Sequence, residues 1–474
     1  MTQLKQYKYS ITPIIGSVIL YVLLAYFSKR SDFLNLLLLY SGLFYCAWHI
    51  IKATKSNFWA LAGIGVFFRL LFLPSIPNLS QDFYRFLWDG QIVTWLQNPY
   101  VFTPEQYVNL ESEAAYNNFG VSISNARELV KGMGELNASH YSNYPPINQL
   151  CFAIAAFFAK SSILGSVIAL RVIIIAADIG ILYFGKKLLE KLNLPVKNIF
   201  WYFLNPFIII ELTGNLHFEG VMLFFVVWSL YLLHEKKWFW AAVLMGVSVS
   251  VKLLPLLFLP LLFKHLLLNQ NKLTEPEMSG GADTLHVRKM VLFYAVTLIT
   301  VALTFAPFLS AAFISNFAAT ISLWFQNFEF NASVYYIIRW IGYQTVGWNI
   351  IETVGKILPL IVITLILYLA FFRRNTTTQQ LITAILLAVS FYFLLATTVH
   401  PWYIATPLLL SVFTRYKFPI IWSFMVLFSY SAYGVEGFSE NLGLVALEYI
   451  VVIGVAAYEL VIKKPLQFLD TEKV

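Results

Sequence analysis

Three ionisable side chains stand at helical spacing between residues 80 and 90. Asp82, Arg85 and Asp89 lie at positions i, i+3 and i+7, so a helix here would carry them on one face. The preceding Pro77-Asn-Leu-Ser80 is typical of a helix start. A carboxylate in this place could act as a general base, and the neighbouring guanidinium could bind an anion. The alternative is a structural acid–Arg–acid stripe on an interfacial helix, and the sequence does not separate the two.

A second polar group surrounds the turn Gly214-Asn-Leu-His217. Glu211, His217 and Glu219 stand at the ends of two apolar segments, where ionisable groups are costly unless they are paired. They could bind sugar hydroxyls or a phosphate group. The spacing Glu-x5-His-x-Glu matches no recognised set of metal ligands. We therefore expect no metal site and no other cofactor, although the sequence leaves the need for a divalent ion undecided.

A lysine interrupts the apolar segment 238–263. Lys252 stands there with Pro255 and Pro260, and both flanking connections are basic. A broken hairpin therefore fits this segment better than one straight span. Lys252 could reach an anionic lipid headgroup, or its long side chain could extend to the membrane surface as an ordinary anchor.

The sequence His400-Pro-Trp402-Tyr403 directly follows an apolar segment that we expect to lead outward. Trp and Tyr at a membrane boundary usually anchor a span in the interface. That explanation accounts for Trp402 and Tyr403 but leaves the titratable His400 unexplained. We therefore treat this group as a candidate for substrate binding.

Composition places these residues in a membrane protein. Hydrophobic residues make up 59% of the 474 residues and charged residues 12%, about half the charge that is usual in a soluble chain. Apolar segments of about 20 residues recur from end to end, and each can cross a hydrocarbon core of about 30 Å. We predict an all-α integral membrane fold, a polytopic bundle of about 12–13 transmembrane helices that forms one domain over residues 1–474.

The placement of Lys and Arg sets the expected orientation, because these residues collect on the cytoplasmic side. Both chain ends and the connection 264–289 are basic, so we predict cytoplasmic termini in a multi-pass protein of the cell membrane. Two segments then fall on the outer face. The first, 74–146, has three basic residues against seven acidic ones, and its many aromatic side chains favour interfacial helices. The second is 310–352.

Three parts of the expected topology are irregular. An odd number of crossings must lie between the outer segment and the basic connection 185–198, so we predict one full span at 163–184 and a short or re-entrant helix at 147–159. Spans at 199–213 and 218–234 bracket the Gly214–His217 turn, which then falls on the outer side. The remaining irregular part is the hairpin that contains Lys252.

Several classes of function are disfavoured. The net charge of +8 comes mostly from connections between spans, so it does not indicate a nucleic-acid partner. The sequence has no Walker loop, Rossmann fingerprint, HExxH or CxxC motif, which argues against an ATP-driven transporter. Cys46 and Cys151 both stand in apolar runs and fit packing better than a disulfide.

Together the motifs resemble those of GT-C-type glycosyltransferases, in particular the polyprenol-phosphate-mannose-dependent mannosyltransferases. The resemblance extends over most of the chain. The motifs that support it occur in the family's order and are all expected on the same side of the membrane. They are Ser80-Gln-Asp82 with Trp88-Asp-Gly90, Asn98-Pro-Tyr100, Tyr144-Pro-Pro146 with Gln149, Asn205-Pro206, Gly214-Asn-Leu-His217, Lys252 with Pro255 and Pro260, and His400-Pro-Trp-Tyr403. Two features depart from the family pattern: two extra spans precede the first large outer loop, and a strict Asp-x-Asp is absent.

The resemblance implies a reaction and its partners. A sugar, mannose in this family, would move from polyprenyl phosphate in the membrane lipid to a glycolipid or glycan acceptor, by an inverting single displacement at the outer face. Asp82 would be the catalytic base, and fixed cations would stabilise the leaving phosphate. Besides Asp82, the residues that we expect to bind substrate or phosphate are Arg85, Asp89, His217, Glu219, Lys252, Arg339, His400, Trp402 and Tyr403.

Two other interpretations stay open at this point. A non-enzymatic lipid or polysaccharide transporter or flippase would also need many spans and buried cations, but its charged cavity would be reachable from both faces. Another transferase with a lipid-linked donor would share the architecture and differ in the sugar that it transfers.

Overall fold

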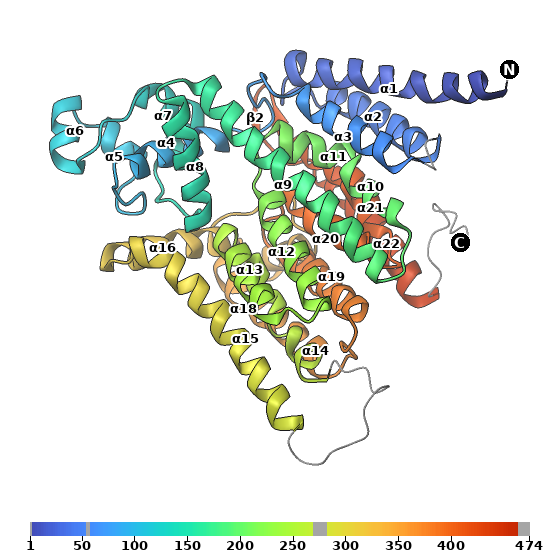
Figure 1. Ribbon diagram of the computed structural model, residues 1–474. Coiled ribbons are helices and arrows are strands. Elements are labelled where there is room, and N and C mark those ends of the chain that lie inside the picture. The colour runs from blue at the N-terminus through green and yellow to red at the C-terminus, as the bar shows by residue number, and fades with distance from the viewer. Residues whose placement is uncertain (1, 54–56, 269–281, 463–474) are drawn as a thin grey trace.

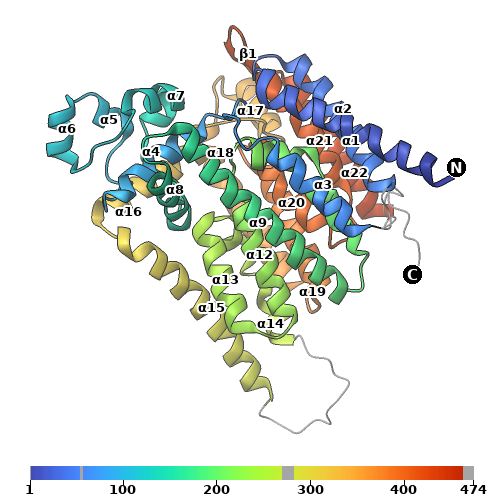
Figure 2. The ribbon, with the colours of Figure 1, turned by 45° about the horizontal axis from the view of Figure 1, so that its top comes forward.

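Helices form almost all of the chain, as expected in lipid, where backbone N–H and C=O groups must find partners within the chain. The computed structural model describes residues 2–53, 57–268 and 282–462. Within these residues, six helices are long and apolar enough to span a membrane: α2 (Phe33–Ala53), α9 (Ile163–Lys191), α15 (Ala282–Phe305), α18 (Ile351–Phe371), α19 (Thr378–Leu395) and α22 (Leu442–Ile462). Six shorter apolar helices accompany them in one bundle (Figures 1 and 2). The predicted all-α polytopic fold is confirmed.

Three N-terminal helices, α1 (Thr2–Phe27), α2 and α3 (Phe58–Leu70), lie together at one side of the bundle (Figure 1). A buried ion pair connects them to the centre. Arg69 Nε of α3 lies 2.8 Å from Asp178 Oδ2 of α9, and both side chains are fully buried. Because a buried charge requires its partner, this pair fixes α3 against α9.

The predicted outer segment 74–146 folds into α4 (Asp82–Thr94), α5 (Pro104–Val108), α6 (Ser112–Phe119) and α7 (Ala126–Ala138), the lobe at the upper left of Figure 1. Trp88, Leu129 and Met133 are fully buried between these helices. Thr103 and Gln106 form a reciprocal capping box at the start of α5. The segment is therefore an ordered helical lobe, and its side of the membrane stays a prediction.

The short helix predicted at 147–159 is present as α8 (Pro146–Ala159), whereas the span predicted at 199–213 is not one continuous helix. The chain there divides into a 3-10 turn at Val196–Ile199, α10 (Phe200–Phe203), α11 (Pro206–Ile208) and a π-helical turn at Ile209–Gly214. Pro206 lacks an amide hydrogen and disfavours helical backbone at the residue before it, so Asn205 is extended and begins a new helix. The chain then bends by 114° into α12 (Glu219–His234).

The predicted hairpin at 238–263 is present. α13 (Trp238–Val251) leads to Lys252, whose backbone is extended, and a 3-10 turn at Leu254–Phe258 leads back to α14 (Leu262–Leu268). His234, just before α13, contacts Thr378 Oγ1 at 3.0 Å, and Lys264 of α14 donates to the Arg373 carbonyl at 3.0 Å. Both ends of the hairpin therefore lie beside the connection between α18 and α19, and Lys252 is at the opposite apex.

The two remaining predicted loops contain more helix than expected. Of the segment 264–289, residues 269–281 lie outside the described residues, and α14 and α15 extend into the rest. The segment 310–352 contains α16 (Ala311–Gln326) and α17 (Val334–Thr345). The other elements are α20 (Ala405–Ser411), α21 (Phe418–Met425), the hairpin β1 (Tyr433–Gly434) and β2 (Gly437–Phe438), and 3-10 turns at Ala306–Phe308, Pro401–Ile404 and Val426–Ala432.

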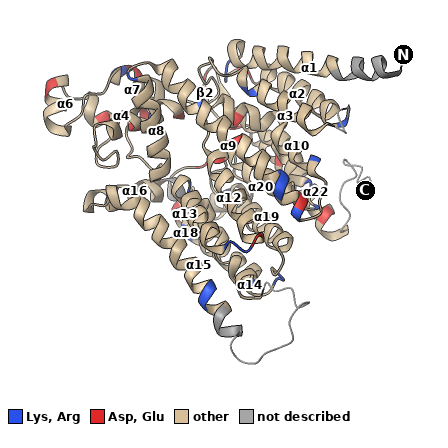
Figure 3. Ribbon diagram, in the orientation of Figure 1, with Lys and Arg blue, Asp and Glu red and all other residues tan. Residues whose placement is uncertain are grey.

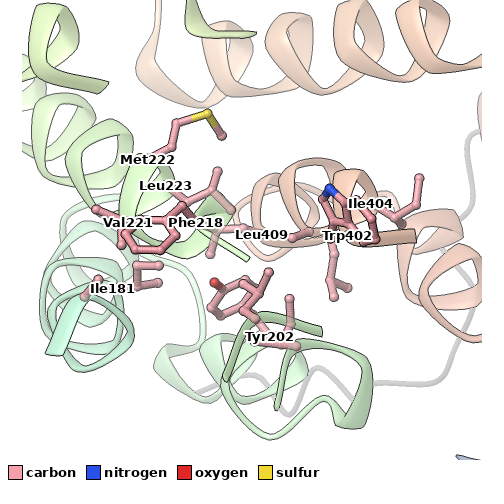
Figure 4. Packing of buried hydrophobic residues seen from close by; sticks show 14 of the residues in the cluster. Ile181, Tyr202, Phe218, Val221, Met222, Leu223, Trp402, Ile404 and Leu409 are labelled. Carbon is pink, nitrogen blue, oxygen red and sulfur yellow. The ribbon is translucent and has the colours of Figure 1, made fainter. Parts of the chain in front are cut away.

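An apolar core supports the region where the polar motifs meet. Ile181, Tyr202, Phe218 and Leu409 are nearly fully buried and converge from separate segments (Figure 4). Trp402 lies at the edge of this cluster and is 7% exposed. Lys, Arg, Asp and Glu lie mainly at helix ends and in connections (Figure 3). The aromatic side chains of the candidate site therefore rest on close-packed support.

Candidate functional site

Asp82 is the first residue of α4, as the sequence predicts. Its backbone amide donates to Ser80 Oγ at 3.3 Å, and Asn137 Nδ2 of α7 donates to its carboxylate at 3.4 Å. The side chain is half-buried. Burial raises the pKa of Asp82 above its ordinary value of 3.8, while the positive charges of Arg30 and Lys252 oppose the rise. A carboxylate with a raised pKa is a stronger base than an exposed one.

The segment that leads into α4 is hydrogen-bonded to two other parts of the chain. Asn78 Nδ2 donates to the carbonyls of Leu24, at 2.7 Å, and Ser28, at 3.0 Å, at the end of α1. Asn215 Oδ1 accepts from the Leu79 amide at 3.3 Å. These bonds join the first helix, the segment before Asp82 and the turn after residue 214.

Arg171 of α9 links the segment before α4 to the turn that contains His217. It is fully buried and donates only to backbone carbonyls, at distances of 2.7–2.9 Å. These carbonyls belong to Leu73, Ser75, Thr213 and Gly214. Because one guanidinium bonds both segments, the turn that carries His217 is held against the segment that carries Asp82.

Arg85 and Asp89 share a face of α4, but they bind each other. Their side chains are buried and form an ion pair at 2.8 Å. Arg85 also donates to the carbonyls of Asn137 and His140, and Asp89 accepts from Ser142 and Gln149. This arrangement corresponds to the structural alternative for these two residues, because each charge is paired within the lobe. Arg85 also lines a small pocket together with Asn137, His140 and Thr320.

Lys252 is brought to the same end of the bundle as Asp82. It forms an ion pair with Glu219 at the start of α12, and its Nζ lies 5.6 Å from the centre of the Tyr403 ring. Asn148 Nδ2 of α8 donates to the Val251 carbonyl at 2.8 Å and so holds the apex of the hairpin. Lys252 therefore belongs to the candidate site and is not a surface anchor.

His217, Trp402 and His400 form a continuous stack. The ring centres of His217 and Trp402 are 3.6 Å apart at 16°, and those of Trp402 and His400 are 4.6 Å apart at 5°. Tyr403 meets His400 edge-on at 5.4 Å. The stack brings two motifs that are 183 residues apart into contact, which the sequence does not reveal.

His400 lies in the connection after α19 and is neutral at pH 7. Burial lowers its pKa to about 3, and the charges of Arg30 and Lys252 add to the shift. A neutral imidazole can donate or accept a hydrogen bond, but it supplies no positive charge to a phosphate. The expected role of His400 as a fixed cation therefore does not fit its surroundings.

Arg339 lies in a different polar cluster on α17. It pairs with Glu329, its guanidinium carbon lies 4.3 Å from the centre of the Tyr336 ring, and Glu329 also accepts from Tyr335 at 2.7 Å. Within the described residues no hydrogen bond or ion pair joins Arg339 to Asp82. The structure thus does not bring Arg339 into the group around Asp82.

Arg30, in the connection between α1 and α2, is the cation that the sequence prediction missed. Its guanidinium carbon lies 3.2 Å from the centre of the Tyr433 ring, and its charge acts on both Asp82 and His400. A signal was present, since the predicted topology places this connection on the outer side, where Lys and Arg are uncommon.

The acidic residues near the 214–217 turn do not assemble as metal ligands. Glu211 accepts hydrogen bonds from Tyr40, at 3.0 Å, and Tyr430, at 2.7 Å, while Glu219 pairs with Lys252. Across the part of the chain that the structure describes, no group of three or more His, Cys, Asp and Glu side chains could hold a metal ion.

Two family models match the chain. The model of the alpha-(1->6)-mannopyranosyltransferase N-terminal domain matches residues 18–267, and that of the PIG-M mannosyltransferases matches residues 213–460. Each match covers just over half of the chain. The chain belongs to the GT-C-type membrane mannosyltransferases. No curated protein matches it.

Membership in the mannosyltransferases agrees with the resemblance found in the motifs and favours a transferase over a transporter. The two matches overlap at 213–267, the part that holds His217, Glu219 and Lys252. The first match begins at residue 18, inside α1, so it includes the connection between α1 and α2 that contains Arg30.

Because Arg85 and Asp89 are buried as a pair, a variant of Asp89 can distinguish a structural role of this residue from a role in the reaction. We expect Asp89→Asn to destabilise the mannosyltransferase by about 3–5 kcal/mol, because it leaves the Arg85 charge buried without its partner. A lower melting temperature and faster proteolysis of the 74–146 lobe would show this. The matched control is Glu113→Gln, an exposed carboxylate in the same lobe. An inactive Asp89→Asn variant with unchanged stability would contradict the structural role.

Proposed function

We propose that this mannosyltransferase moves mannose from a polyprenyl-phosphate donor to a lipid-linked or glycan acceptor, by one inverting displacement at the outer membrane face. The observation that supports this most is the setting of Asp82. A half-buried carboxylate with a raised pKa lies in the field of two cations, Arg30 and Lys252. A base and a positively charged region side by side suit the transfer of a sugar away from a phosphate.

The proposed reaction uses Asp82 as general base. The carboxylate accepts the proton of an acceptor hydroxyl while the hydroxyl oxygen forms a bond to the anomeric carbon. The bond between that carbon and the phosphate oxygen breaks on the opposite side, so the configuration inverts. The electron pair leaves with polyprenyl phosphate, whose growing negative charge is stabilised by nearby cations.

The remaining residues have supporting roles in this proposal. Lys252 faces the phosphate, and Glu219 orients it through their ion pair. Tyr403 offers a flat surface to the sugar or to the lipid. The two histidines on either side of Trp402 cover both faces of its ring and hold it in place. Polar groups on a rigid aromatic support keep their geometry during the reaction.

The outer-face location rests on the distribution of basic connections. Glu219 at the start of α12 lies at the candidate site, and His234 at its end contacts Thr378. The 16 residues of α12 separate these ends by about 24 Å. Lys191 pairs with Glu235 at 2.9 Å, so basic connections collect at the end away from Asp82, which we assign to the cytoplasm together with both chain termini.

The most direct functional test removes the proposed base. We expect Asp82→Asn to abolish mannosyl transfer while expression and thermal stability remain normal, because the amide cannot accept the proton. Initial rates would be measured on purified protein with polyprenyl-phosphate mannose as donor. Glu113→Gln serves as the control, and GDP-mannose tests the alternative of a nucleotide donor. Turnover close to wild type in Asp82→Asn would remove Asp82 from the mechanism.

The pH dependence follows from the raised pKa of Asp82. The carboxylate must be ionised to accept a proton, so activity is lost as the pH falls through its pKa. We expect the acid limb of kcat/KM to have its midpoint above 3.8, the ordinary value of aspartate. Lys252→Met should move that midpoint to higher pH, because a cation that favours the carboxylate is lost. A midpoint at or below 3.8 would contradict the assignment.

A further inference from the structure

Among the residues that the structure describes, Arg30 differs from Lys252, Arg85 and Arg171 in lacking both an anionic partner and an acceptor for its Nε. Lys252 pairs with Glu219 and Arg85 with Asp89, while Arg171 donates to four backbone carbonyls. Within the described residues Arg30 forms no ion pair with a carboxylate. A cation already paired with a carboxylate offers less net charge to a bound phosphate, so the unpaired guanidinium is the better electrostatic complement.

The position of Arg30 is fixed by its neighbours. Asn78, four residues before Asp82, bonds the Leu24 and Ser28 carbonyls just before Arg30. The guanidinium lies over the Tyr433 ring at 3.2 Å, which restricts its plane. Arg30 Nε is buried and has no hydrogen-bond partner in the described part of the chain. A buried donor without a partner is costly, which points to a ligand that supplies the acceptor.

The charge of Arg30 also acts electrostatically on groups at the candidate site. It is the cation with the largest effect on the Asp82 carboxylate, ahead of Lys252, and it acts on His400 as well. Yet Arg30 and Asp82 form no ion pair in the described structure. The two groups therefore interact through their charges without forming an ion pair, as a base and an anion-binding group must when a substrate lies between them.

We propose that Arg30 binds the phosphate of the lipid-linked donor and of the polyprenyl phosphate that leaves. This inference rests on the proposed function and adds a residue to it. A guanidinium donates through its planar N–H groups to two phosphate oxygens, and a ring beneath it keeps that plane fixed. As the bond from the anomeric carbon to the phosphate oxygen breaks, the phosphate gains charge next to Arg30, and the acceptor proton goes to Asp82.

Chemical protection tests the proposal on the unaltered protein. Purified full-length protein in detergent is treated with phenylglyoxal, which modifies arginine, and modification of Arg30 is followed by mass spectrometry. We expect a short-chain polyprenyl phosphate to protect Arg30, and the polyprenol of the same length to give no protection. Protection by inorganic phosphate at the same low concentration would overturn the assignment to a lipid-linked phosphate, and modification unaffected by polyprenyl phosphate would overturn the site itself.

Variants give a second, independent measurement. Arg30→Gln should weaken binding of polyprenyl phosphate about ten-fold or more, the loss expected for a charge-assisted hydrogen bond, while binding of the polyprenol stays unchanged. Arg30→Lys should restore part of the affinity. Lys29→Gln is the matched control, since the neighbouring Lys29 has the same charge and is exposed. Unchanged affinity in Arg30→Gln would refute the role of Arg30.

The two proposals fail in different ways. If wild-type protein binds polyprenyl phosphate and Arg30→Gln binds it equally well, the proposed function stands and the role of Arg30 is refuted. If wild-type protein binds polyprenyl phosphate no better than the polyprenol, the donor class itself is wrong, and the inference about Arg30 falls with it.

Discussion

A charge buried in a membrane protein is costly unless an opposite charge lies beside it, and this constraint organises the mannosyltransferase. The pair of Arg69 and Asp178 joins α3 to α9, and the pair of Lys252 and Glu219 holds the hairpin apex against α12. These contacts set the frame in which Asp82 stands. Arg30 departs from this pattern, because in the described residues no carboxylate pairs with it and its Nε has no hydrogen-bond partner. Among these residues Arg171 also lacks a carboxylate partner, but backbone carbonyls accept its hydrogen bonds.

Much of the fold could be predicted from the sequence, because apolar length and the placement of Lys and Arg report directly on membrane spans. The helical class, the short α8 and the hairpin at Lys252 are confirmed. The span predicted at 199–213 is divided into short helices, because hydropathy measures apolar character and does not report breaks in the backbone. Pro206 begins a new helix there, and the chain bends by 114° between that helix and α12.

The candidate site was less predictable, since its contacts join residues far apart in the chain. The position of Asp82 at a helix start could be predicted from local spacing. The same spacing suggested that Arg85 binds substrate, but in the structure Arg85 forms an ion pair with Asp89. The neutral state of His400 depends on burial that only the folded chain creates. Arg30 was missed because basic residues between two spans, here Lys29 and Arg30, usually set orientation. The contact that distinguishes Arg30 is with Tyr433, which lies 403 positions away.

The central claim is that a donor phosphate lies between the cations while Asp82 faces the anomeric carbon from the other side. An experimental structure of the Asp82→Asn variant with intact polyprenyl-phosphate mannose tests this most directly. The account predicts phosphate oxygens within hydrogen-bond distance of Arg30 and Lys252, and the amide of residue 82 on the face of the sugar opposite the phosphate. A donor bound with its phosphate away from both cations, or with residue 82 on the phosphate side, would contradict it.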